Sequence, residues 1–187
     1  SSSGGKNLCD PTDGPGLVSD LGLLGCPITV EKVLLIGAGG AVLGVLGLLM
    51  ELSPTDLVVR NRTSAKAETL CQELVAATPS KSGTAVRGFG LDYQGDPFDL
   101  VINGTSAAYS DSAPMIDDDL VKGAVCYDMM YGRELTPFLR WSKEQGARDV
   151  SDGLGMLVGQ AAESFFIWRS VRPSVTPVVD SLRRLLQ

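Results

Sequence analysis

The chain has 187 residues, of which 44% are hydrophobic and 20% are charged, and its formal net charge is −6. A domain of this length buries a full core, and an acidic chain with scattered Lys and Arg is poorly suited to nucleic acid or to an anionic membrane. The sequence contains no histidine, which excludes Ser-His and Cys-His nucleophile pairs and removes the commonest zinc ligand, so no metal site is predicted.

The start of the chain and its cysteines bear on domain organisation and location. Residues 1–8 begin Ser-Ser-Ser-Gly-Gly and are interpreted as a linker or cloning remnant, which leaves residues 9–187 as one domain. No secretory signal is recognised. None of the four cysteines forms a C-x-x-C pair, so we expect reduced thiols in a cytoplasmic protein: Cys9, Cys26, Cys71 and Cys126.

The first predicted unit is a buried strand, a glycine turn and a helix. Val33–Ile36 is an aliphatic run, residues 37–41 are Gly-Ala-Gly-Gly-Ala, and a helix is expected over Gly40–Glu51. Gly37 allows a tight turn out of the strand, and Gly39 lets backbone N–H groups approach a phosphate. This arrangement holds a dinucleotide pyrophosphate at a helix N-terminus. The match is incomplete because Val42 stands where a strict G-x-G-x-x-G has its last glycine.

A membrane helix is an alternative for the same stretch. Residues 33–50 carry no charged side chain, and Gly40 and Gly44 have the spacing of a transmembrane packing motif. Five glycines interrupt the run, three of them where a turn is needed, and strands and helices keep alternating downstream. The pattern therefore favours a dinucleotide-binding unit.

The second predicted strand, Asp56–Arg60, ends where such a unit holds the adenosine ribose. An acidic side chain there would bond the free 2′-hydroxyl of NAD. The chain instead offers Asn61 and Arg62, with Lys66 about a turn later. Cations beside the ribose suit a 2′-phosphate, so the sequence predicts NADP as the cofactor.

The rest of the chain continues the alternation of strand and helix. Helices are expected over 63–77, 136–145, 153–169 and 174–186, and strands over 84–89, 99–103, 124–127 and 147–150. Apolar strands separated by amphipathic helices predict an α/β, Rossmann-like doubly wound parallel sheet with helices on both faces. Ligands of such sheets bind beyond the carboxyl ends of the strands, so the segments that follow the strands are the candidate site.

Six ordered motifs carry a resemblance to a known family. They are Asp13-Gly14-x-Gly16, Gly37-Ala38-Gly39-Gly40-Ala41, Asn61-Arg62-Thr63, Asn103-Gly104-Thr105-Ser106, Tyr127-Asp128-Met129-x-Tyr131 and Asp152-Gly153-Leu154-Gly155-Met156-Leu157-Val158-x-Gln160. From about Asn7 onward the chain resembles the C-terminal, NADP-binding domain of shikimate dehydrogenase (shikimate 5-dehydrogenase).

The resemblance implies NADP-dependent interconversion of 3-dehydroshikimate and shikimate, a step in aromatic amino acid biosynthesis. It implies cofactor contacts from Gly37, Ala38, Gly39, Gly40, Ala41, Asn61, Arg62, Thr63, Lys66, Thr105, Met129 and Gly153, of which Met129 and Gly153 lie at the nicotinamide. It also implies substrate contacts from Asp13, Tyr131 and Gln160. Asp13 would match the family's catalytic aspartate, which works with a lysine.

Departures from the family pattern keep alternatives open. We expect the family's substrate domain, with its carboxylate-binding serines and its catalytic lysine, to be missing. Pro11 stands where the family usually has Asn, Leu43 where a basic residue is common, and Gly104 where Ala is usual. The alternatives are an isolated or engineered NADP-binding module without turnover, or a quinate/shikimate dehydrogenase relative. Self-association is expected through apolar surface near Asp13, Leu17 and the final helices.

Overall fold

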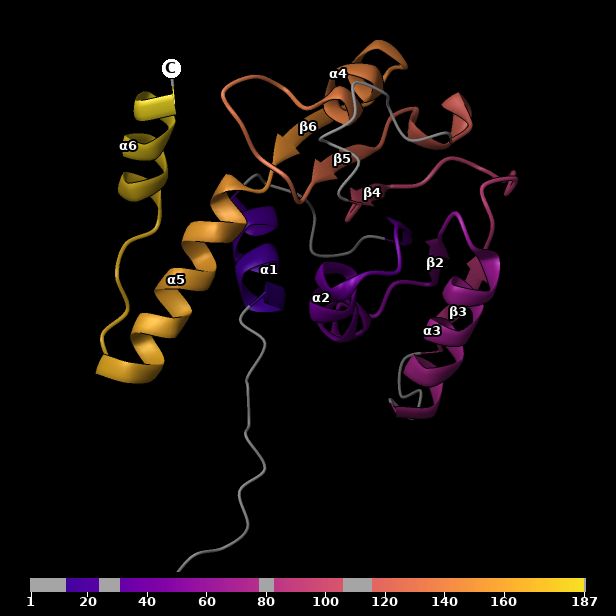
Figure 1. Cartoon of the computed structure of the whole chain (residues 1–187), viewed down its shortest axis with the longest axis horizontal. Coiled ribbons are helices and arrows are strands. Elements are labelled where there is room, and N and C mark those ends of the chain that lie inside the picture. Colours follow the sequence, from indigo (N-terminus) through magenta and orange to yellow (C-terminus); the bar gives the residue numbers. More distant parts are fainter. Residues whose placement is uncertain (1–12, 24–30, 78–82, 106–115, 187) are drawn as a thin grey trace, which may run out of the picture.

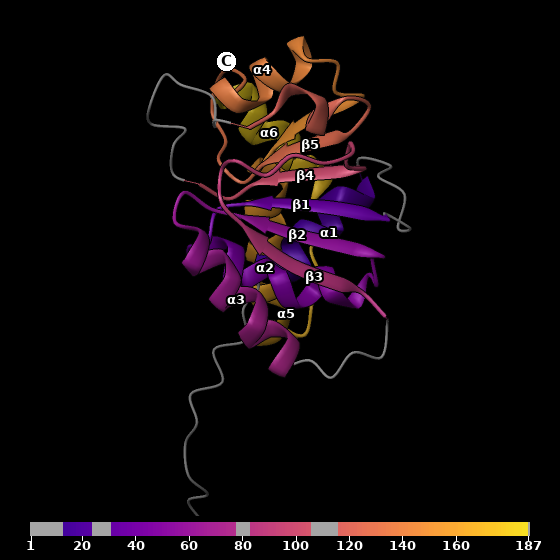
Figure 2. The ribbon, with the colours of Figure 1, turned by 90° about the vertical axis from the view of Figure 1, so that its right-hand side faces the viewer.

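The computed structural model describes residues 13–23, 31–77, 83–105 and 116–186, and its centre is a six-stranded parallel sheet. The strand order is β3-β2-β1-β4-β5-β6, the order of dinucleotide-binding folds. Figure 2 shows most of these strands nearly edge-on, with β1 in the middle. The strands are β1 (Lys32–Ile36), β2 (Asp56–Arg60), β3 (Ala85–Phe89), β4 (Leu100–Asn103), β5 (Val125–Asp128) and β6 (Asp149–Asp152).

The register brings the carboxyl ends of the central strands to one edge of the sheet. Ile36 at the end of β1 pairs with Arg60 of β2 on one side and with Asn103 of β4 on the other. The strand order reverses between β1 and β4, and in open α/β sheets this reversal leaves a crevice that receives the ligand. The glycine turn that follows Ile36 therefore starts at the crevice.

Helices cover both faces of the sheet, as predicted, and the strands are apolar because both of their faces are buried. Val33 and Leu35 of β1 belong to a core under the helices α1 (Asp13–Leu23), α2 (Gly40–Glu51), α3 (Ser64–Ala77) and α5 (Leu154–Arg169). Leu34 and Ile36 belong to a second core under α4 (Pro137–Glu144) and the short 3-10 helix η2 (Asp118–Val121). The predicted fold class is confirmed.

Helix α1 was not predicted, because Gly14, Pro15 and Gly16 suggest a turn. The helix lies between α2 and α5 (Figure 1), where the two glycines allow close approach. A Cβ atom on Gly16 would lie 2.7 Å from the carbonyl oxygen of Met156, and one on Gly14 would lie 3.1 Å from the Cβ of Leu48. These glycines therefore serve helix packing rather than a turn.

The remaining boundaries differ from the prediction by a few residues at most. Helix α2 and strand β2 have the predicted bounds, whereas β6 begins two residues later than expected, at Asp149. The last helix, α6 (Thr176–Leu186), buries none of its side chains. In the part of the chain that the structure describes, no helix combines the length and the apolar character that a bilayer crossing requires.

Candidate functional site

A cavity of about 280 Å³ lies at the carboxyl edge of the sheet. Its walls come from the segments that follow β1, β4, β5 and β6. Six predicted site residues line it: Ala41, Thr105, Met129, Tyr131, Gly153 and Gln160. Four lining residues were not predicted, although all but Met130 are named residues of a motif: Gly104, Met130, Met156 and Leu157. The structure thus gathers residues from four distant motifs into one pocket.

The glycine turn borders this cavity through Ala41, in the first turn of α2. Gly37 has a φ of +111°, a conformation that side-chain-bearing residues rarely adopt, and its N–H donates to the carbonyl oxygen of Arg60 at 2.7 Å. Gly39 caps α2 without a side-chain hydrogen bond. A Cβ atom on Gly39 or Gly40 would meet nothing within 4 Å. The helix N-terminus therefore faces open space, as binding of a pyrophosphate requires.

The two arginines at the end of β2 have different environments. Arg60 is 1% exposed, its Nε donates to the carbonyl oxygen of Gly90 at 2.9 Å, and burial lowers its pKa. Arg62, Thr63 and Lys66 are exposed. The Nδ2 of Asn61 donates to the carbonyl oxygen of Thr63 at 3.0 Å, which shapes the turn. Arg62, and not Arg60, is therefore the arginine available to an outside anion.

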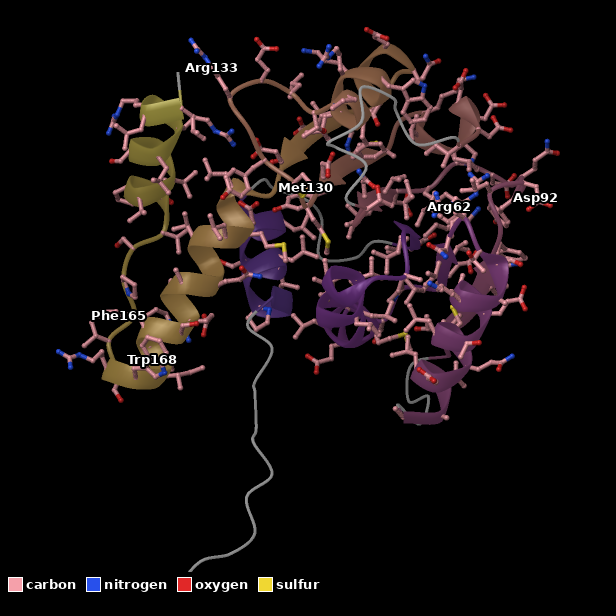
Figure 3. All side chains as sticks on the ribbon, in the orientation of Figure 1. Arg62, Asp92, Met130, Arg133, Phe165 and Trp168 are labelled. Carbon is pink, nitrogen blue, oxygen red and sulfur yellow. The ribbon has the colours of Figure 1, made fainter. Side chains whose placement is uncertain are left out.

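The predicted residues 61–66 do not line the cavity. They lie beside the glycine turn, because Gly37 is hydrogen-bonded to the end of β2. Figure 3 shows Arg62 next to α3 and Met130 across the molecule beside the upper end of α5. The candidate site is thus elongated, with cations at one end and the cavity at the other.

Thr105 is fixed at the cavity by Asn103. The Oδ1 of Asn103 accepts from the backbone N–H of Thr105 at 3.2 Å and from its Oγ1 at 2.7 Å. Between them, a Cβ atom on Gly104 would lie only 2.5 Å from Cγ2 of Val42. The two departures noted in the sequence, valine at 42 and glycine at 104, therefore compensate each other.

The loop after β5 is held by a buried carboxylate. Asp128 accepts from Oγ1 of Thr136 at 2.5 Å and from the backbone N–H of Met130 at 3.1 Å, and burial raises its pKa. Met129 donates its N–H to the carbonyl oxygen of Asn103 at 2.9 Å. Asp128 is thus occupied in shaping the loop that presents Met129 and Met130 to the cavity.

Gly153 closes the cavity from the end of β6. A Cβ atom there would overlap the carbonyl oxygen of Met129, and the Gly153 N–H donates to the carbonyl oxygen of Met130 at 3.1 Å. Only glycine fits this approach. Tyr131 is 44% exposed at the mouth, and Gln160 faces the same cavity from α5.

A buried polar pair that sequence reasoning missed lies behind the cavity. Tyr127 Oη donates to Oδ2 of Asp20 at 2.6 Å, and burial raises the pKa of both groups. A Cβ atom on Gly155 would overlap the Asp20 carboxylate. The pair joins α1 to β5 at the start of α5, and Asp20 stands outside every motif.

Some predicted residues have no described surroundings. Asp13 begins α1, but its side chain lies outside the described part of the chain, and Pro11, Cys9 and Cys26 lie outside it as well. Cys71 and Cys126 are described and lie buried as free thiols, and burial raises the pKa of each to about 11.

Comparison with known proteins identifies the family. A family model described as "Shikimate / quinate 5-dehydrogenase" matches residues 24–109, and one described as "Shikimate 5'-dehydrogenase C-terminal domain" matches residues 153–183. A curated relative from Cellvibrio japonicus, "Shikimate dehydrogenase (NADP(+))", is 48% identical over 98% of this chain. The chain belongs to the shikimate dehydrogenase family. It spans 65% of the length of that relative.

Solved structures agree with this membership of the shikimate dehydrogenase family. A crystal structure of an "Ael1 enzyme" from Pseudomonas putida is 40% identical, with a TM-score of 0.81 over 91% of this chain and 62% of that chain. A shikimate 5-dehydrogenase from Thermus thermophilus, in complex with NADP(H) and shikimate, is 26% identical, with a TM-score of 0.70 over 92% of this chain and 62% of that one. The predicted resemblance is confirmed.

Proposed function

We propose that this chain binds NADP(H) along the carboxyl edge of its sheet and forms the cofactor-binding part of an enzyme that reduces 3-dehydroshikimate to shikimate, a step in aromatic amino acid biosynthesis. One observation carries the proposal. The open N-terminus of α2 lies between the exposed cations at the end of β2 and the cavity formed by Met129 and Gly153. An extended anionic dinucleotide matches that layout.

The roles follow the layout. Residues 37–41 hold the pyrophosphate with backbone N–H groups, and residues 61–63 with Lys66 hold the 2′-phosphate. Thr105, Met129 and Gly153 form the nicotinamide pocket, where the dihydronicotinamide supplies hydride. Tyr131 and Gln160 contact the substrate at the mouth, and Asp13 handles the hydroxyl proton.

The apolar walls of the pocket have a clear task. Met129 and Met156 keep water from the reacting face, and Gly153 allows the loop after β5 to approach the turn after β6. The fixed backbone of these two segments orients whatever occupies the pocket. These residues thus contribute position and exclusion of water, while proton transfer falls to Asp13.

A cofactor titration tests the first half of the proposal. NADPH should bind more tightly than NADH, and Arg62→Ala should weaken NADPH binding by about ten- to a hundredfold, because a charge-assisted bond is lost. Arg148→Ala is the matched control, since Arg148 is also exposed but lies just before β6. Equal affinities of the wild-type chain for NADPH and NADH would contradict the assignment.

We further propose that the 187-residue chain binds NADP(H) without turning over shikimate. No lysine of this sequence matches the family's catalytic lysine by motif. Loss of a general acid–base group costs about 10²–10⁴ in rate, and loss of substrate positioning costs more. NADPH oxidation with 3-dehydroshikimate is the assay. Robust turnover would show that Asp13 with another base, such as Tyr131, suffices.

A quinate/shikimate dehydrogenase is the second candidate for the substrate, because the matched family model covers both activities. The exposed cations near the end of β2 favour NADP and so weigh against a relative that also uses NAD. Parallel assays with quinate and shikimate, on a preparation in which this chain is combined with a substrate domain of the family, would separate the two candidates.

Self-association is proposed through the end of α5. Phe165, Phe166, Ile167 and Trp168 are 38–79% exposed there, whereas Leu17, which the sequence placed near such a surface, is fully buried. Figure 3 shows Phe165 and Trp168 at the end of α5 farthest from the sheet. Sedimentation at rising concentration should show association that Trp168→Gln reduces, and a chain that stays monomeric throughout would refute this point.

A further inference from the structure

Arg183 makes an ion pair that the candidate mechanism does not use. Its two terminal nitrogens bind the two carboxylate oxygens of Asp152, at 2.7 Å to Oδ2 and 2.6 Å to Oδ1. Asp152 is 6% exposed, whereas α6, which carries Arg183, buries none of its side chains. Figure 1 shows α6 at the margin of the molecule, outside α5. A peripheral helix thus makes a bidentate contact to a buried carboxylate.

The ion pair reaches both walls of the cavity. Oδ1 of Asp152 also accepts from the N–H of Leu154 at 3.2 Å, so the carboxylate sets the turn that contains Gly153. A terminal nitrogen of Arg183 lies 3.5 Å from the carbonyl oxygen of Gly132, the residue after Tyr131. Arg183 therefore contacts the segment after β5 and the last residue of β6 at the same time.

Loss of this ion pair should shift the turn at Gly153 for an electrostatic reason. Asp152 lies near a second buried carboxylate, Asp20, and the charge of Asp152 adds to burial in raising the pKa of Asp20. Removing the guanidinium leaves Asp152 buried without its cation, which a protein relieves by moving the carboxylate toward water. The turn that carries Gly153 would move with it. The core clusters themselves keep their side chains, because no side chain of α6 is fully buried.

We propose that Arg183 is a positioning residue of the cofactor site, which fixes the turn at Gly153 against the loop at Tyr131 and so shapes the nicotinamide end alone. The proposal rests on the proposed function. The cation Arg62 lies across the molecule from α6 in Figure 3, and the other residues of the 61–66 segment follow it directly. The adenosine end should therefore be independent of Arg183.

Two ligands separate the ends of the site. NADPH fills both ends, whereas adenosine 2′,5′-bisphosphate carries the 2′-phosphate without a nicotinamide. Arg183→Gln should weaken NADPH binding by about tenfold while leaving binding of the bisphosphate unchanged. Arg183→Lys keeps the positive charge but cannot bind both carboxylate oxygens with two fixed nitrogens, so it should lose part of the NADPH affinity. Arg184→Gln is the matched control, because the structure gives Arg184 a contact to the Ser181 hydroxyl and none to Asp152 among described residues.

The outcomes are distinct. Unchanged NADPH affinity in both Arg183 variants would overturn the proposal, as would an equal loss for both ligands, which would indicate a general effect on folding. If Arg183→Gln does not fold, the lysine variant decides alone by the same comparison. A wild-type chain that binds neither ligand would refute the proposed function, and this inference with it.

Discussion

Tyr127→Phe is the sharpest test of the buried pair behind the cavity. The ring of Tyr127 is fully buried in β5, so phenylalanine keeps the packing of the ring. The substitution removes the hydroxyl that donates to Asp20, which is only 8% exposed. A hydrogen bond to a charged group contributes about 1.5–3 kcal/mol, so the free energy of unfolding at pH 7 should fall by about that amount.

The loss should depend on pH. Burial raises the pKa of Asp20, and the Tyr127 hydrogen bond partly offsets that rise, so the variant has a higher pKa still. A carboxyl group with a raised folded pKa contributes fully below its unfolded value of 3.8 and loses that contribution as pH rises through the folded value. The difference between wild type and variant should therefore be small in acid and reach its full size at neutral pH.

Urea unfolding at pH 7 and at mildly acidic pH measures both effects. In a thermal melt at neutral pH, the melting temperature should fall by roughly 3–12 °C for a chain of this size. Tyr131→Phe is the control, since Tyr131 is 44% exposed at the cavity mouth. A Tyr127→Phe variant as stable as wild type at pH 7 would refute the reasoning.

Three further predictions concern single positions. Gly39→Val should abolish NADPH binding and leave the unfolding free energy nearly unchanged, because Gly39 has an ordinary φ of −99° and its Cβ would meet nothing within 4 Å. Unchanged NADPH affinity in a fluorescence titration would show that the phosphate does not bind beside Gly39. Gly104→Ala should destabilise by about 1–3 kcal/mol through overpacking against Val42, and the added change Val42→Ala should recover part of this loss. Additive losses in denaturant melts would contradict the compensation. Cys126 should resist alkylation in the folded chain, because burial raises its pKa to about 11, and peptide mapping after iodoacetamide treatment measures this.

The sequence by itself determined the elements whose pattern is local. The aliphatic run at 33–36, the glycines after it and the uncharged helix over Gly40–Glu51 lie within one short segment, so strand, turn and helix were predicted with bounds that differ by one residue at most. The same holds for β2 and for the exposed Arg62 that follows it. Because the carboxyl ends of parallel strands share one edge, the motifs after the strands also predicted where a site would form.

Only the tertiary structure decided the features that depend on distant partners. Gly14 and Gly16 suggest a turn locally, yet they form a helix because α2 and α5 pack against them. Arg60 and Arg62 cannot be told apart in the sequence. In the structure Arg60 is buried and contacts Gly90, whereas Arg62 stays exposed. Asp20 was not predicted for the same reason, because its burial depends on contacts with Tyr127 and Gly155, which lie far along the chain.

The ion pair of Asp152 with Arg183 shows most clearly what could not be predicted from the sequence alone. The two residues are 31 positions apart, and nothing in the spacing of Arg183 on an exposed helix distinguishes it from Arg184. Local pattern reports which backbone conformation a segment prefers. Which charges are taken out of water together depends on how helices from both ends of the chain meet the same sheet edge, and that is settled only when the chain is folded.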